Sequence, residues 1–74
     1  WFIQPNPSNG QITVHMPQNA VVQSYEVIDM LGRTIIESNL PEDGQLNLGA
    51  LPSGRYMLRI HSKDQVKVLP LIRH

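Results

Sequence analysis

Glycine and proline interrupt this chain so often that no long helix fits between them. The 74 residues include five glycines and six prolines, and no stretch keeps a 3.6-residue hydrophobic period over three turns. The segments between these residues are short and alternate apolar with polar side chains, which is the pattern of β-strands joined by turns. The runs expected to form strands are 1–3, 11–16, 21–29, 33–38, 45–48, 55–61 and 66–72.

About seven short strands in a single domain, residues 1–74, favour an all-β fold: an immunoglobulin-like antiparallel β-sandwich rather than a closed barrel. The apolar residues that alternate along these strands can be buried together only between two sheets. The expected core consists of Ile12, Val14, Val27, Leu46, Leu48, Tyr56, Leu58 and Ile60.

The turn residues agree with this fold. Segments 29–32 and 41–44 each end in glycine, and both are expected to form hairpin turns. Asp29 is expected to cap the first of these turns. Gly32 and Gly54 are expected to have a positive φ or to permit a close approach of the backbone, because each ends a tight connection.

Tyr56 follows a corner of the chain, residues 51–55, at the start of an expected strand. In immunoglobulin-like sandwiches a tyrosine in this position often donates its hydroxyl to the nearby backbone, an arrangement called the tyrosine corner. The alternative is that Tyr56 is simply an aromatic residue of the core. The sequence leaves both interpretations open.

Charge and composition exclude several classes of function. Six basic residues balance six acidic ones, which argues against electrostatic binding of nucleic acid and against a polybasic membrane anchor. Cysteine is absent, so neither a disulfide nor a thiolate metal site is expected. No apolar run is long enough to span a bilayer. The chain begins with Trp1, and we expect it to be a piece of a larger protein.

The sequence offers no arrangement of residues typical of catalysis. His15, His61 and His74 are far apart and share no metal-ligand spacing; the first two are expected to be solvated surface residues. The only adjacent carboxylates, Glu42 and Asp43, lie in a turn, where acidic residues are common. We therefore expect no enzyme activity, no cofactor and no metal.

Basic side chains alternate with the expected core residues near the end of the chain. Arg55, Arg59 and His61, with Lys67 as a further candidate, are predicted to form a mildly basic stripe. A solvated face is the usual explanation of such a stripe, and a docking surface is the alternative. Glu26 is expected to pair with Arg59 across the outer face if their strands are neighbours.

Three segments, taken in order, resemble a known family. Pro-Asn-Pro at 5–7 is followed by Gly10 and an alternating strand, and Val-Ile-Asp-Met-Leu-Gly-Arg occupies 27–33. Leu-Asn-Leu at 46–48 then precedes Leu-Pro-Ser-Gly-Arg-Tyr-Met-Leu-Arg-Ile at 51–60. This order and spacing resemble the C-terminal sorting domain, type A, of the Bacteroidetes type IX (Por) secretion system.

The resemblance implies a non-catalytic signal that directs an exported protein through the periplasm to the cell surface or the extracellular space of a Gram-negative cell. It implies an outer-membrane translocon, its shuttle component and, in many members, a surface sortase as partners. The matching residues of the sorting motifs are Pro5, Asn6, Pro7, Gly10, Asp29, Gly32, Arg33, Leu51, Pro52, Gly54 and Tyr56. The candidate recognition residues of the tail are Lys67, Leu69, Leu71 and Ile72.

The tail also suggests how a partner binds. Pro70 cannot donate to a strand ladder, so the run that contains it is expected at a sheet edge, where another protein can add a strand. Deleting 69–74 is then expected to block export; the alternative is that the tail merely completes the core. Two other functions remain open: an immunoglobulin-like accessory or adhesion module, and a structural subunit of a surface assembly that associates through an edge strand.

Overall fold

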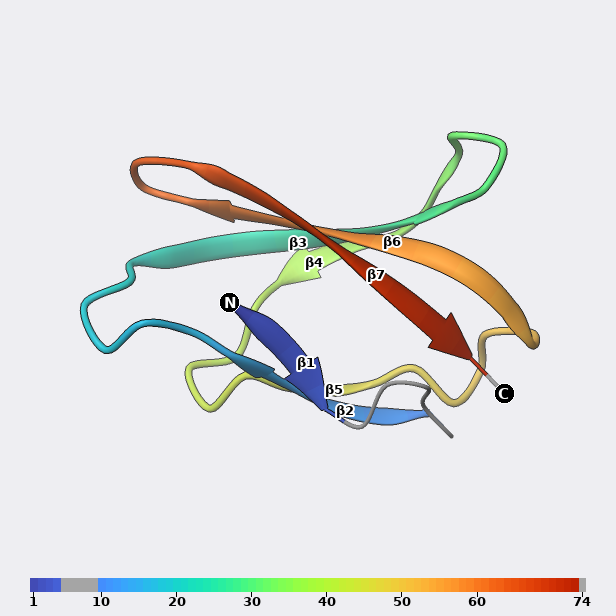
Figure 1. The fold of residues 1–74 in the computed structure, drawn as a ribbon, viewed down its shortest axis with the longest axis horizontal. Helices are drawn as coiled ribbons and strands as arrows, with labels where there is room; N and C mark the ends of the chain where they lie inside the picture. Colours follow the sequence, from blue (N-terminus) through green and yellow to red (C-terminus); the bar gives the residue numbers. More distant parts are fainter. Residues whose placement is uncertain (5–9, 74) are drawn as a thin grey trace.

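The structure is a computed structural model that describes residues 1–4 and 10–73. Within these residues the chain forms two antiparallel sheets, one with the strand order β1-β2-β5 and one with the order β4-β3-β6-β7 (Figure 1). The strands are β1 (Phe2–Gln4), β2 (Gln11–His15), β3 (Val22–Asp29), β4 (Thr34–Asn39), β5 (Gln45–Asn47), β6 (Gly54–Ser62) and β7 (Val66–Arg73). The predicted all-β sandwich is confirmed.

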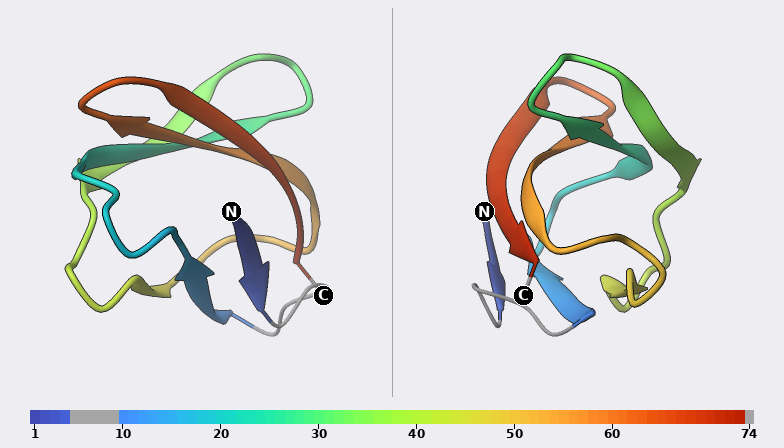
Figure 2. Two further views of the ribbon diagram at one scale, coloured as in Figure 1. Left: turned by 60° about the vertical axis from the view of Figure 1, so that its left-hand side comes forward. Right: turned by 90° about the vertical axis from the view of Figure 1, so that its right-hand side faces the viewer.

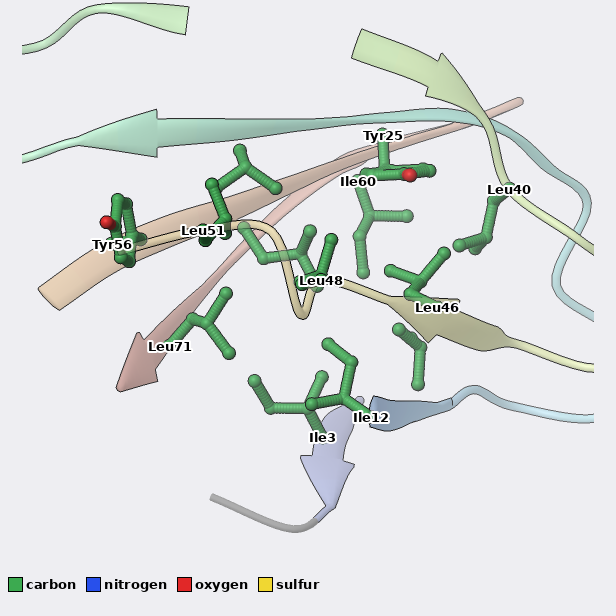
Figure 3. Packing of buried hydrophobic residues seen from close by; sticks show 13 residues of the cluster. Ile3, Ile12, Tyr25, Leu40, Leu46, Leu48, Leu51, Tyr56, Ile60 and Leu71 are labelled. Atoms are coloured by element: carbon green, nitrogen blue, oxygen red, sulfur yellow. The ribbon is translucent and has the colours of Figure 1, made fainter. Parts of the chain in front are cut away.

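The two sheets form separate layers (Figure 2). The hydrophobic core lies between them. Side chains from both layers meet there, so that Ile12 of β2 and Ile60 of β6 belong to one cluster (Figure 3). All eight residues predicted for the core are buried. The cluster also contains Ile3, Tyr25, Leu40, Leu51 and Leu71.

β4 contains a β-bulge at its two adjacent isoleucines. Val27 is opposite Ile36 and Ile28 is opposite Thr34, which leaves Ile35 as the extra residue on β4. Ile36 packs against the core whereas Ile35 is exposed. The extra residue places Thr34 opposite Ile28 on the outer face of the sheet, where its hydroxyl reaches Glu26.

Pro70 lies within β7, which is an edge strand as predicted. The β6–β7 hairpin closes with a bond of 2.9 Å that the Ser62 N–H donates to the Gln65 carbonyl. Hydrogen-bonded and non-bonded pairs alternate from there, so Met57 and Pro70 form a non-bonded pair. The missing N–H of Pro70 therefore removes no bond between β6 and β7.

Two expectations about local structure are wrong. The 41–44 turn forms, with the Gly44 N–H donating to the Pro41 carbonyl at 2.9 Å, but it joins β4 to β5, which belong to different sheets. It is a connection between layers rather than a hairpin. The strand expected over 21–29 starts one residue later, because β3 begins at Val22 and Val21 is 58% exposed.

Candidate functional site

Two of the motif-bearing connections meet at one end of the sandwich, together with the end of β7. The register places Asp29, at the end of β3, opposite Tyr56 of β6, and Tyr56 opposite Leu71 of β7. The β3–β4 turn, the connection to β6 and the end of β7 lie at the right-hand side of Figure 1. This end of the sandwich is here called the motif end. An open groove in it is lined by Asp29, Met30, Leu31, Arg33, Thr34, Ile35, Pro52, Gly54, Arg55 and Tyr56.

The β3–β4 turn is held by the Asp29 carboxylate. Its Oδ1 accepts the N–H groups of Leu31 and Arg33, each at 2.9 Å, and its Oδ2 accepts Arg33 Nε at 2.7 Å. The Gly32 N–H donates to the Asp29 carbonyl at 3.0 Å, and Gly32 has a φ of +85°. The hydrogen bond from the backbone N–H of Arg33 is the main reason why the pKa of Asp29 is lowered. The predicted hairpin turn, its cap and the positive φ of Gly32 are confirmed.

The tyrosine corner is present. The buried Tyr56 donates its hydroxyl to the Pro52 carbonyl at 2.7 Å. Gly54, between them, has a φ of +156°, as expected of this position. The bond ties the start of β6 to the connection that precedes it, and so it shapes one wall of the groove.

Replacing Tyr56 with phenylalanine is expected to lower the free energy of unfolding by about 1 kcal/mol, because the Pro52 carbonyl loses its donor while the ring stays buried. Urea unfolding measures the change. Tyr25→Phe is the matched control: Tyr25 is equally buried, and among residues 1–4 and 10–73 its hydroxyl has no hydrogen-bond partner. Equal effects of the two substitutions would show that the hydrogen bond of the tyrosine corner contributes nothing to the free energy of unfolding.

Gly10 joins the motif end from the other sheet. Its carbonyl accepts the Leu48 N–H at 2.5 Å, and a Cβ on Gly10 would lie 2.9 Å from the Gly49 Cα. Arg73 donates to the Gly49 carbonyl at 3.3 Å, which brings the end of β7 to the same place. Pro5, Asn6 and Pro7, the remaining motif residues, lie outside the described residues.

The four tail residues lie on two faces of β7. Lys67, Leu69 and Leu71 alternate toward the inner face, where Leu71 is only 1% exposed, whereas Ile72 is on the outer face and exposed. Lys67 is opposite the buried Ile60. Its assignment to the basic stripe is therefore wrong, because strand alternation puts it on the opposite side of the sheet from that stripe.

Glu26 is the centre of a polar cluster on the outer face of the four-stranded sheet. It forms an ion pair with Arg59 at 3.5 Å, as predicted, and a closer contact of 2.5 Å with His61 Nε2. Thr34 donates its hydroxyl to the same carboxylate at 3.2 Å. The bond to His61 is the main cause that lowers the pKa of Glu26, with Thr34 and Arg59 adding to it against partial desolvation.

Both histidines differ from the expected solvated residues. His61 is half-exposed and bound to Glu26. His15 stacks on Phe2, with ring centroids 4.4 Å apart, and its buried Nε2 has no partner among the residues that the structure describes. These contacts depend on how the strands pair: Phe2 is opposite His15, and Ser24 is opposite His61. Neither register can be deduced from one strand alone, so the sequence does not predict the two contacts.

Acidification is expected to destabilise the domain through Asp29 and Glu26. Their pKa values are lowered on folding from 3.8 and 4.5, so the stabilisation is complete above the unfolded values and is lost as the pH falls through the folded ones. Thermal midpoints measured from pH 7 to pH 2 should fall mainly below about pH 4. Glu26→Gln should flatten this dependence, and Glu42→Gln, in an exposed turn, is the control. An unchanged curve in Glu26→Gln would contradict this assignment.

The described residues contain no group of three histidine, aspartate or glutamate side chains that could hold a metal ion. In the same part of the chain, no helix has the length and apolar character needed to cross a bilayer. A comparison with proteins of curated function found no match.

The described residues form an antiparallel β-sandwich, which is the fold that the resemblance to a sorting domain implies. Residues 3–72 match the family described as the secretion system C-terminal sorting domain, and the chain belongs to this family. It is a C-terminal sorting signal for type IX secretion. Such a signal directs its protein to the cell surface or the extracellular space and interacts with the type IX secretion system.

Proposed function

We propose that residues 1–74 act as one non-catalytic sorting domain that the outer-membrane translocon of the type IX system recognises in the periplasm. The shuttle component of that system is its second proposed partner, and a surface sortase is the third. The observation that supports this proposal best is the family match over residues 3–72. The exported protein then arrives outside the Gram-negative outer membrane.

We further propose two roles for the motif residues. Gly10, Asp29, Gly32, Gly54 and Tyr56 build the motif end, because each makes or permits one of its tight connections. Leu51 is buried in the core, and its proposed role is to support the motif end. The side chains that a partner can contact are then the exposed ones, including Arg33 and Pro52.

The tail residues divide in the same way. Leu71 is part of the core, so its proposed role is to hold β7 in place. Ile72 is 39% exposed on the outer face of the same strand, and Lys67 and Leu69 are half-buried. We propose that the translocon or shuttle component contacts Ile72 directly.

A fusion of residues 1–74 to the C-terminus of an exported reporter tests the function. The reporter is expected on the surface or in the medium of a type IX-competent strain, and in the periplasm of a translocon mutant. Periplasmic retention in both strains would overturn the proposal.

The role of the tail needs a point substitution rather than a deletion, because removing 69–74 also removes the buried Leu71. Ile72→Glu is expected to reduce export while the domain keeps its cooperative thermal transition. Val21→Glu is the control, at an apolar position outside β7 that is 58% exposed. Equal export of the two variants would exclude direct contact at Ile72.

A further inference from the structure

Part of the free edge of β7 is open to another strand. The bond from Ser62 to Gln65 sets the alternation along the β6–β7 ladder, in which Ile60 and Lys67 form a bonded pair. The backbone groups of Val66 and Val68 therefore point away from β6. Within residues 1–4 and 10–73, none of these outward groups has a hydrogen bond.

The side chains along this edge have a definite pattern. Val66 and Val68 are 52% and 49% exposed on the outer face of the sheet. Lys67 lies between them on the inner face, and no acidic side chain of the described residues pairs with it. A strand added here would place its alternate residues beside the valines on one face and beside the lysine on the other.

We propose that Val66–Val68 is a docking edge for an extended segment of a partner protein in which a carboxylate lies between two apolar residues. The backbone groups of Val66 and Val68 bind the main chain of the segment, as in other cases of β-strand addition. Lys67 pairs with the carboxylate, and the two valines contact the apolar residues. The proposal rests on the sorting function, for which it specifies the chemistry of the bound partner.

A second copy of this chain is a poor occupant of the edge. In an antiparallel pairing of two copies centred on Lys67, this lysine would lie opposite Lys67 of the other copy. In a pairing centred on Val68, Val66 would face Pro70, which has no N–H to donate. Charges and prolines on edge strands oppose self-association in this way, whereas a segment with an acidic residue is favoured.

Peptide binding to the 74-residue chain tests this inference. The probes are two seven-residue synthetic peptides, one with glutamate between two central valines and one with lysine in place of the glutamate. Titration followed by amide NMR is expected to shift the signals of Val66 and Val68, with binding of the glutamate peptide at least tenfold tighter. Lys67→Glu is expected to reverse this preference.

Val68→Pro supplies a second variant, because it removes an outward N–H without breaking a bond to β6, as Pro70 does two residues later. It is expected to weaken binding of the glutamate peptide at least tenfold. Circular dichroism confirms that each variant is folded, and Lys67→Glu remains informative if the proline variant does not fold. Equal affinity for both peptides, no binding, signal shifts confined to other strands, or a dimer in sedimentation that Lys67→Glu dissolves would each overturn the proposal.

The reporter assay separates this inference from the sorting function. If the wild-type fusion reaches the surface and the fusions with Lys67→Glu and Val68→Pro do so equally, the docking edge is not used for sorting and the inference fails alone. If the wild-type fusion stays in the periplasm of the competent strain, the sorting function fails whatever the peptides show. Reduced export of both variants with retained folding is the expected result.

Discussion

Replacing Leu58 with alanine is expected to lower the free energy of unfolding by about 2–5 kcal/mol. Leu58 is 0% exposed and lies at the middle of β6, with Val27 on one neighbouring strand and Leu69 on the other. Truncation leaves a cavity that these neighbours can fill only by moving strands whose register is set by the ladder. A small domain has little stability beyond this amount, so the variant is expected to be partly unfolded at 37 °C.

Denaturant unfolding followed by circular dichroism measures the effect. Leu31→Ala is the matched control, since it removes the same atoms from a side chain that is 79% exposed, and it should change stability by less than about 0.5 kcal/mol. An unfolding midpoint of Leu58→Ala as high as that of Leu31→Ala would mean that β6 does not hold the core together.

The sequence predicts the central strands well because their pattern is local. Tyr56, Leu58 and Ile60 alternate with polar residues, and this period alone identifies the face that is buried. The turn at 29–32 is equally local: the capping carboxylate and the glycine lie within four residues of each other. The edge position of β7 also follows from one residue, Pro70, and its missing donor.

Other parts of the core have no periodic pattern. Leu40 and Leu51 are buried although they lie in connections between strands, where side chains follow no fixed alternation. They are covered because the chain passes from one sheet to the other beside them. His15 is comparable, since its stacking on Phe2 depends on a pairing between two strands that only the folded chain shows.

The candidate site is predictable in its parts and not in its assembly. Asp29, Pro52, Gly54 and Tyr56 can each be singled out from motifs. Their common groove arises from the β3–β6 register, which places Asp29 opposite Tyr56 across 27 positions of sequence. The open edge at Val66 cannot be predicted from the sequence for a related reason. It depends on which residue pairs of β6 and β7 are hydrogen-bonded.

A second large loss of stability, about 2–4 kcal/mol, is expected on replacing Gly44 with alanine. Gly44 has a φ of +72°, which an L-residue adopts only with strain. Its carbonyl accepts the Val14 N–H at 2.7 Å, and a Cβ on Gly44 would clash with the Val14 carbonyl oxygen. The clash pushes against backbone, so no side-chain rotation relieves it.

Gly32→Ala is the control that separates the two costs. Gly32 also has a positive φ, but a Cβ there meets nothing within 4 Å, so only the backbone strain of about 1 kcal/mol remains. Because Gly44 joins β2 to the turn that precedes β5, its substitution should also loosen the three-stranded sheet, and amide exchange at Ile12 and Leu46 should rise more than exchange in β6. Equal losses in the two glycine variants would show that strain alone determines the cost and that the contact with Val14 can relax.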